Sequence, residues 1–178
     1  MGVSEIDRLD LRLNQLEDRV DRRLTMHETR IDALQAKVDF FVQASLPPVR
    51  GIFYDGQVFD AMVFAMRYIL SAKESILLID GWVDLGTLEL LAKKANGVAV
   101  TIVTSRCGNG LSAGDVMRFN EQYGGLTVCE SKSFHDRFLV VDDRRLYLIG
   151  TSLKDLGRKC FAFTTLDPAE IPNLKARI

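Results

Sequence analysis

The sequence predicts an α/β protein with a long N-terminal helix, and three observations support this fold class. Apolar residues repeat with heptad spacing from about Glu5 to Phe41. Beyond Pro47 and Pro48, the periodicity switches repeatedly between the two-residue repeat of strands and the 3.6-residue repeat of helices. The prolines themselves end the helix, because they lack a backbone donor and restrict the residue before them. We therefore expect a coiled-coil oligomerisation helix over residues 1–45 and one α/β domain over residues 46–178.

The composition is typical of a soluble globular protein. The chain has 178 residues, of which 47% are hydrophobic and 26% are charged, enough for one domain with a buried core. It has no apolar stretch long enough to cross a bilayer, and its N-terminal residues are too densely charged for a signal peptide, so we expect a cytoplasmic protein without a transmembrane segment. The net charge of −1 argues against non-specific coating of nucleic acid. Three widely spaced cysteines suggest neither a disulfide framework nor a metal site, and no cofactor is expected.

The N-terminal helix carries an apolar seam with alternating steps of three and four residues. The seam positions are Ile6, Leu9, Leu13, Leu16, Val20, Leu24, His27, Ile31, Leu34, Val38 and Phe41. Two successive steps of four around Val20 form a stutter that locally unwinds the supercoil. Such a narrow stripe needs a partner helix, so we expect a homo-oligomer, with packing against the chain's own α/β domain as the alternative. His27 is interpreted as a polar layer that fixes register, or as a pH-sensitive or anion-binding layer.

The α/β domain is predicted from alternating strand and helix patterns. Strands are expected at Gly51 to Tyr54, Ser75 to Asp80, Val98 to Thr104, Leu126 to Glu130, Arg137 to Asp142, Arg145 to Ile149 and Cys160 to Thr165. Helices are expected at Gln57 to Ala72, Leu85 to Ala95 and Ala113 to Tyr123, with a short helix beginning near Ser152. This order predicts a mixed, mostly parallel sheet with helices on both faces.

Candidate ligand-binding residues follow several of the predicted strands. In open α/β sheets ligands collect at the carboxyl ends of strands. Asp80 with Asp84, Ser105 with Arg106, and the turn around Gly150 occupy such positions. The nearby loop from Cys107 to Gly110 lacks the Gly-Lys-Ser/Thr of a phosphate loop and is interpreted as a flexible connection.

The chemistry is expected to centre on His135, one of two histidines in the chain. On a strand, His135, Arg137 and Leu139 project to the same face. An imidazole beside a fixed cation suits phosphate chemistry, because negative charge grows on the phosphoryl oxygens as a bond to phosphorus forms. Gly150-Thr151-Ser152 then opens a helix whose free amides can bind an anion. The alternative is a structural histidine bonded within the core.

This segment resembles a known family signature. His135-x-Arg137-x4-Asp142, followed by Gly150-Thr151-Ser152, resembles the His-x-Lys-x4-Asp and Gly-Ser-x-Asn elements of the phospholipase D-like superfamily. The run from Gly51 to Leu166 is similar to a single-motif branch often found C-terminal to phage-antirepressor-type DNA-binding domains. The resemblance implies one histidine that attacks phosphorus and a second that protonates the leaving group. With one motif per chain, two subunits must each supply one His135.

The resemblance also implies roles for individual residues. The implied catalytic residues are His135, Arg137 and Asp142, and the implied phosphate-binding residues are Arg137, Gly150, Thr151, Ser152 and Lys154. Arg137 replaces the usual lysine, and Leu153 occupies the usual asparagine position, where Ser152 or Lys154 could be recruited instead. Asp142 either orients a neighbouring group or begins the turn with Asp143.

Three functions are open at this point. The first is a metal-independent, nuclease-type phosphodiesterase with a histidine pair shared between subunits. The second is a catalytically inactive module that binds a phosphate group of nucleic acid, a nucleotide or a lipid headgroup, and oligomerises through the coiled coil. The third is a purely structural oligomerisation protein.

Overall fold

A computed structural model describes residues 4–45, 49–105 and 110–178. The chain divides into two compact units, Met1–Pro48 and Val49–Ile178. The predicted proline joint at residues 46–48 and most of the predicted flexible loop, together with Arg106, lie outside the described residues.

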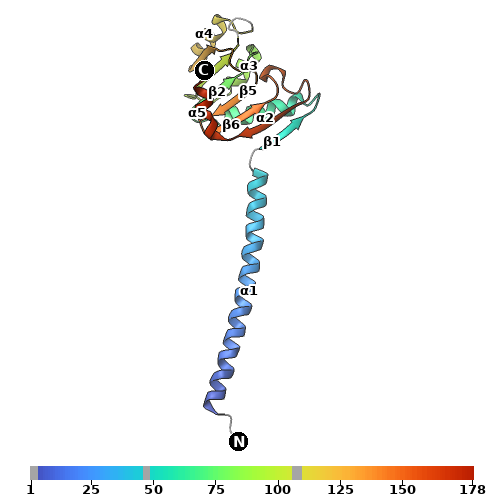
Figure 1. Ribbon diagram of the computed structural model, residues 1–178, viewed down its shortest axis with the longest axis vertical. Helices are drawn as coiled ribbons and strands as arrows, with labels where there is room; N and C mark the ends of the chain where they lie inside the picture. The colour runs from blue at the N-terminus through green and yellow to red at the C-terminus, as the bar shows by residue number, and fades with distance from the viewer. Residues whose placement is uncertain (1–3, 46–48, 106–109) are drawn as a thin grey trace. The chain divides into compact units, whose positions relative to one another are not determined.

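The first unit is a single helix, α1, over Glu5–Ser45 (Figure 1). Its 41 residues correspond to about 60 Å at 1.5 Å per residue. A capping box begins it: Ser4 Oγ accepts the Asp7 N–H at 3.2 Å, and the Asp7 carboxylate accepts the Ser4 N–H at 3.0 Å. Every seam side chain from Leu9 to Leu34 is exposed, which leaves the seam open to a partner helix.

The second unit contains a seven-stranded mixed sheet with the order β1-β7-β6-β5-β2-β3-β4. Its strands are β1 Arg50–Phe53, β2 Ser75–Ile79, β3 Ala99–Thr104, β4 Leu126–Glu130, β5 Arg137–Val141, β6 Arg145–Ile149 and β7 Phe161–Leu166. The α/β class is as predicted. The expected majority of parallel pairs is corrected, because among the described strands only β2–β3 and β3–β4 pair in parallel. After β4 the chain continues as an antiparallel meander of β5, β6 and β7. Strand β1 pairs antiparallel with β7 and is the outermost strand on that side of the sheet.

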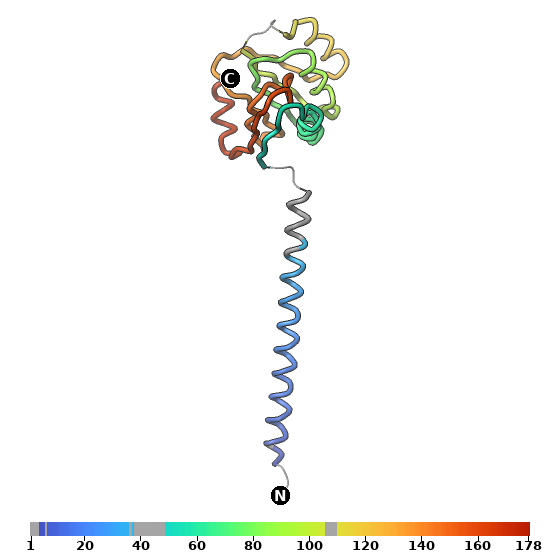
Figure 2. Tube along the Cα trace, turned by 90° about the vertical axis from the view of Figure 1, so that its right-hand side faces the viewer, coloured from blue at the N-terminus to red at the C-terminus, as the bar shows by residue number. Residues whose placement is uncertain are grey.

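Helices cover both faces of the sheet, as predicted (Figure 2). One face carries α2 Val58–Leu70, α3 Leu85–Leu91 and α4 Ala113–Gln122, which share a core with Leu78 and Leu139. The other face carries the 3-10 helix η2 Pro168–Glu170 and α5 Ile171–Lys175, whose Ile171 packs with Val140. The side chains of β5 therefore alternate between two separate cores. None of the helices in the described ranges is both long and apolar enough to cross a membrane.

The α5 segment was not expected from the sequence. It is short, with η2 and α5 together spanning only residues 168–175, so it shows almost no periodicity. A start signal is nevertheless present. The Asp167 carboxylate accepts the Ala169 N–H at 2.9 Å, and Pro168 follows it at the first helical position.

Candidate functional site

Polar residues meet at one edge of the sheet. Strands β2, β3 and β6 end at this edge, and β5 begins there because it is antiparallel to β2 and β6. Asp80 follows β2 directly, Thr104 ends β3 and Arg137 begins β5. The register of β2 with both neighbours, extended by one residue, places Asp80 in a row between Arg137 and Thr104.

Asp80 is the buried centre of this edge. Its side chain is fully buried, and its carboxylate accepts three hydrogen bonds: from Ser152 Oγ at 2.7 Å, from the Leu153 N–H at 3.0 Å and from the Trp82 N–H at 3.0 Å. Burial raises the pKa of Asp80, and this outweighs the lowering by the three donors and by the charge of Arg137.

The Ser152 hydroxyl gives a second reason to expect a raised pKa for Asp80. Ser152 Oγ lies 2.7 Å from the Asp80 carboxylate and also 2.7 Å from the Trp82 carbonyl oxygen. A hydroxyl has only one proton to donate. When Asp80 is ionised, that single proton serves only one of the two oxygens, so the arrangement favours protonation of Asp80 and agrees with a pKa above the usual range.

Arg137 and Thr104 flank Asp80 with unused polar atoms. Arg137 is half-buried, and its Nε is buried without a hydrogen-bond partner among the described residues. Within the same described part, Thr104 Oγ1 is buried and unpaired as well. Buried donors and acceptors without partners are rare in proteins because each one costs the free energy of its lost hydration. These atoms therefore mark a place where a ligand can complete the hydrogen bonding.

His135 is exposed and lies in a bend two residues before β5 begins. The predicted shared face holds for Arg137 and Leu139, which are both strand residues, whereas His135 precedes the strand. Because its side chain is exposed, the alternative of a histidine bonded within the core is wrong. An accessible imidazole next to the first strand residue remains at the edge that carries Asp80 and Arg137.

The helix that was predicted to begin near Ser152 is shorter in the structure than expected. The expected helix is a single 3-10 turn, η1, over Leu153–Asp155. Ser152 is buried, and both its hydroxyl and the next N–H are engaged with Asp80. The Gly150 N–H donates to the Ala162 carbonyl oxygen at 2.9 Å. Gly150 and Ser152 thus serve the fold of the edge, and Thr151 between them is half-buried.

Lys154 contacts an aromatic ring, whereas Gly150 and Ser152 are hydrogen-bonded within the fold. Its Nζ lies 5.7 Å from the ring centroid of Trp82, a cation–π contact. Trp82 is more than half exposed, whereas Lys154 is half-buried. Lys154 thus contacts the ring of Trp82, whose backbone N–H is bonded to Asp80, and it lies two residues after Ser152, which is also bonded to Asp80.

Asp142 lies at the opposite end of β5 from His135. Its carboxylate accepts the backbone N–H groups of Lys73, Glu74 and Ser75 at 2.7 to 3.1 Å, and Arg145 approaches it at 3.4 Å. Burial raises the pKa of Asp142, but the three N–H donors and Arg145 outweigh it, so the pKa lies below its usual range. Asp142 has a φ of 56°, in the tight turn before β6. Both roles that the sequence left open have a counterpart in the structure, because Asp142 begins the turn and also pairs with the neighbouring Arg145.

Other sequence candidates have local roles. The Asp84 carboxylate accepts the Thr87 N–H at 3.0 Å and caps α3. The Ser105 hydroxyl donates to the Gly81 carbonyl oxygen at 2.8 Å. Sequence reasoning overlooked Trp82 and Thr104. Trp82 had a signal, since it is the only tryptophan in the chain and follows a predicted strand.

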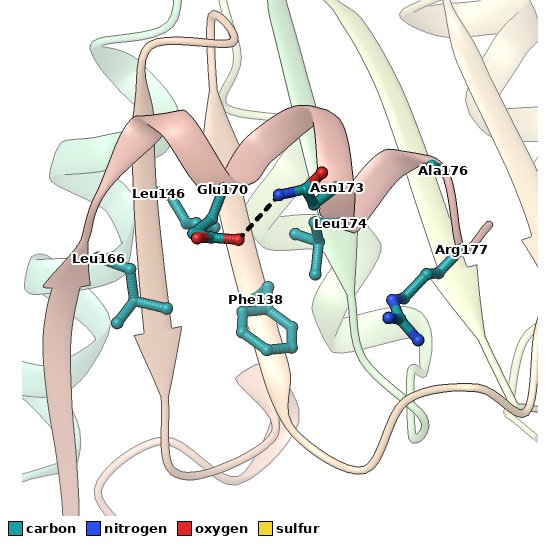
Figure 3. A pocket seen from close by; sticks show the side chains of 8 residues that line it. All are labelled: Phe138, Leu146, Leu166, Glu170, Asn173, Leu174, Ala176 and Arg177. Atoms are coloured by element: carbon teal, nitrogen blue, oxygen red, sulfur yellow. Dashed lines mark hydrogen bonds between the residues drawn. The ribbon is translucent and has the colours of Figure 1, made fainter.

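A separate groove of about 670 Å³ lies on the other face of the sheet, beside α5 (Figure 3). It is lined by Phe138, Leu146, Leu166, Glu170, Asn173, Leu174, Ala176 and Arg177. Phe138 alternates with Arg137 along β5 and so faces away from Asp80. The polar contact drawn in this groove joins Asn173 to Glu170, with 3.2 Å between nitrogen and oxygen. The groove is thus distinct from the edge that carries His135.

Comparisons with known proteins identify the fold. No protein-family model and no curated protein sequence matches the chain. Among solved structures it is similar to NucT from Helicobacter pylori, with 17% identity and a TM-score of 0.53 over 71% of this chain and 91% of that one.

Two other structures show lower similarity. TrmBL2, an archaeal chromatin protein described with a novel mode of DNA binding, has 15% identity and a TM-score of 0.48 over 98% of this chain and 68% of its own. Yeast tyrosyl-DNA phosphodiesterase has 11% identity and a TM-score of 0.41, over 64% of this chain and 31% of its own. The likeness to NucT concerns the fold, and on that ground this chain has a phospholipase D-like fold.

Proposed function

We propose that the protein is a metal-independent, nuclease-type phosphodiesterase that uses His135. One observation carries the proposal: an exposed imidazole and a guanidinium with a buried, unpaired Nε among the described residues lie two residues apart at one edge of the sheet. The fold shared with NucT supports it. Arg137 neutralises the charge that develops on the phosphoryl oxygens.

The reaction proceeds in two displacement steps. A nitrogen of His135 attacks phosphorus, so that an N–P bond forms while the P–O bond to the leaving group breaks, and a second histidine gives its proton to the leaving oxygen. Water then displaces the histidine from phosphorus and returns a proton to the second histidine. His135 is the only histidine outside the N-terminal helix, so the second comes from another copy of the chain, brought close by the coiled coil.

Asp142, Gly150 and Ser152 take no part in this mechanism. Their polar groups are used inside the fold. Asp80 instead acts as the buried carboxyl that holds Ser152, Leu153 and the Trp82 backbone at this edge. Lys154 and Thr151 remain available to contact further phosphate oxygens.

A second candidate, a catalytically inactive phosphate-binding module, is favoured by a different observation. The Ser152 hydroxyl and the Leu153 N–H, which the sequence resemblance would offer to phosphate, donate to Asp80. The edge thus has fewer free donors than a full phospholipase D-like site implies. In this candidate, Arg137 and Lys154 bind the phosphate group and no bond is broken.

Hydrolysis of bis(4-nitrophenyl) phosphate in excess EDTA distinguishes the two candidates. We expect activity in the wild-type chain and a loss of at least about a hundredfold in His135→Ala, because general acid–base and nucleophilic roles are each worth about that much. The matched control is His27→Asn, which removes the other histidine but keeps a polar side chain at this seam position, and it should retain activity. Wild-type inactivity together with binding of inorganic phosphate that disappears in Arg137→Ala selects the inactive module. If neither activity nor phosphate binding is found, both candidates are wrong.

A further inference from the structure

An indole ring is anchored at the edge of the proposed site. Trp82 is two residues after Asp80, and its backbone is held on both sides: its N–H donates to the Asp80 carboxylate at 3.0 Å, and its carbonyl oxygen accepts the Ser152 hydroxyl at 2.7 Å. Its side chain is nevertheless 54% exposed. The fold therefore fixes the backbone that carries this ring while leaving much of the residue's surface to solvent.

A cation accompanies the ring. Lys154 Nζ lies 5.7 Å from the ring centroid of Trp82, and Lys154 comes two residues after Ser152. The hydrogen bonds of Asp80 thus hold the backbone of Trp82 and the Ser152 hydroxyl, two residues before Lys154, and the charge of Arg137 acts on the same carboxyl. An aromatic surface next to cations matches the two parts of a nucleotide, because a base stacks on an aromatic ring while its phosphates pair with cations.

We propose that Trp82 is a base-stacking platform and that the ligand of this site is single-stranded nucleic acid. The inference rests on the proposed function, in which Arg137 and His135 receive the phosphate group. In a duplex the faces of the bases are stacked inside and cannot reach a surface indole, whereas single strands offer them. A lipid headgroup offers no aromatic face. The net charge of −1 also favours a short contact with few phosphates over a long duplex footprint.

The single tryptophan allows a direct test. All fluorescence from tryptophan in the full chain arises from Trp82. In a His135→Ala background, which keeps the oligonucleotide intact, a thymidine oligonucleotide of about ten residues is expected to quench this fluorescence. An abasic oligomer with the same phosphates should bind about tenfold more weakly and without quenching, since one stacked base is worth a factor of about that size. A duplex and glycerophosphocholine should not quench.

Substitutions distinguish the loss of stacking on Trp82 from the loss of any exposed aromatic side chain. In the same background, Trp82→Ala should weaken binding of a labelled thymidine oligonucleotide about tenfold by fluorescence anisotropy, and Trp82→Phe should retain most of the affinity. The control Phe59→Ala removes an aromatic side chain that is 71% exposed on α2, and it should bind normally.

The outcomes distinguish this inference from the proposed function. Equal binding of the abasic and thymidine oligomers, a preference for duplex, quenching by glycerophosphocholine, or normal binding by Trp82→Ala overturns the stacking platform. His135-dependent hydrolysis of bis(4-nitrophenyl) phosphate is measured separately, and the proposed function survives those results if this hydrolysis is present. If no oligomer binds and no hydrolysis occurs, both are overturned.

Discussion

At the scale of single residues, one buried carboxyl explains most of the candidate site. Asp80 binds the Ser152 hydroxyl, the Leu153 N–H and the Trp82 N–H, and it lies in the same row as Arg137. A buried carboxylate is costly unless it is paired, so the fold spends stability to keep a negative charge beside Arg137. The three hydrogen bonds offset part of this cost and connect Ser152, Leu153 and Trp82 to one carboxyl.

The pKa of Asp80 gives a prediction with a definite sign. Because the folded-state pKa lies above the ordinary value of 3.8, the folded state holds the proton more tightly, and wild-type stability falls as pH rises from 3.8 through the folded pKa. Asp80→Asn loses the bond from the Leu153 N–H, a cost of about 1–3 kcal/mol that does not depend on pH. The difference in the free energy of unfolding between wild type and Asp80→Asn should therefore become smaller as pH rises. The decrease is about 1.4 kcal/mol for each unit by which folding raises the pKa of Asp80.

Urea unfolding of wild type and Asp80→Asn at several pH values between about 3.5 and 7.5 measures this difference. Asp136→Asn, which changes an exposed carboxylate beside His135, should stay within about 0.5 kcal/mol of wild type. A deficit of Asp80→Asn that is constant or widens with pH would show that the pKa of Asp80 is not raised.

The sequence predicted which residues lie at the end of the sheet that carries Asp80, but it did not predict their hydrogen bonds. His135, Arg137 and Asp80 could be identified because each lies at or near the end of a clear strand pattern. The engagement of Ser152 could not, because its partner Asp80 is 72 residues away in the chain. A contact of that range depends on which strands become neighbours, and local periodicity carries no information about it.

At the scale of elements, β5 runs from the end of the domain that carries the candidate site to an end held by structural hydrogen bonds. His135 and Arg137 lie at its start, and Asp142 follows its last residue. The positions of the strands followed from their two-residue alternation, but their order did not. The sequence favoured parallel pairs because strands and helices alternate up to β4, whereas β5 instead inserts between β2 and β6 and pairs antiparallel with both.

Asp142 should contribute to stability in a pH-dependent way. Its folded-state pKa is below 3.8, so its contribution is complete above the unfolded pKa and is lost as pH falls through the folded pKa. Asn tolerates the positive φ of 56° at this position but lacks the charge that strengthens the three hydrogen bonds. Asp142→Asn should thus lower the free energy of unfolding by about 1–3 kcal/mol at neutral pH, and less at acidic pH, as measured by urea titration.

The neighbouring residue supplies the control for this substitution. Asp143 has a φ of 52°, is exposed and pairs with Lys175 at the surface. Because exposed ion pairs contribute little, Asp143→Asn should change the free energy of unfolding by less than about 1 kcal/mol. Equal effects of the two substitutions at neutral pH would contradict the role of Asp142 as an anchor for the start of β2.

At the scale of the whole molecule, the chain consists of two units with different means of stabilisation. The unit Val49–Ile178 buries apolar side chains on both faces of its sheet. The described part of α1 buries none of its seam, and an isolated helix with a single apolar stripe gains too little from its own hydrogen bonds to be stable. The heptad pattern therefore predicts self-association, and the proposed mechanism needs it, because each domain has one His135.

Leu13 and Leu11 provide a matched pair for testing this self-association. Both are leucines of α1 with similar exposure, 55% and 59%, but only Leu13 lies on the seam. Loss of a buried leucine costs about 2–5 kcal/mol, so Leu13→Lys should raise the dissociation constant of the oligomer about thirtyfold or more, whereas Leu11→Lys should not. Analytical ultracentrifugation measures the mass of each variant.

If the histidine pair is shared, the specific activity of Leu13→Lys should fall on dilution together with the oligomer, while that of Leu11→Lys stays constant. A monomeric wild type, or full activity in a monomeric Leu13→Lys, would rule out a site that needs two copies.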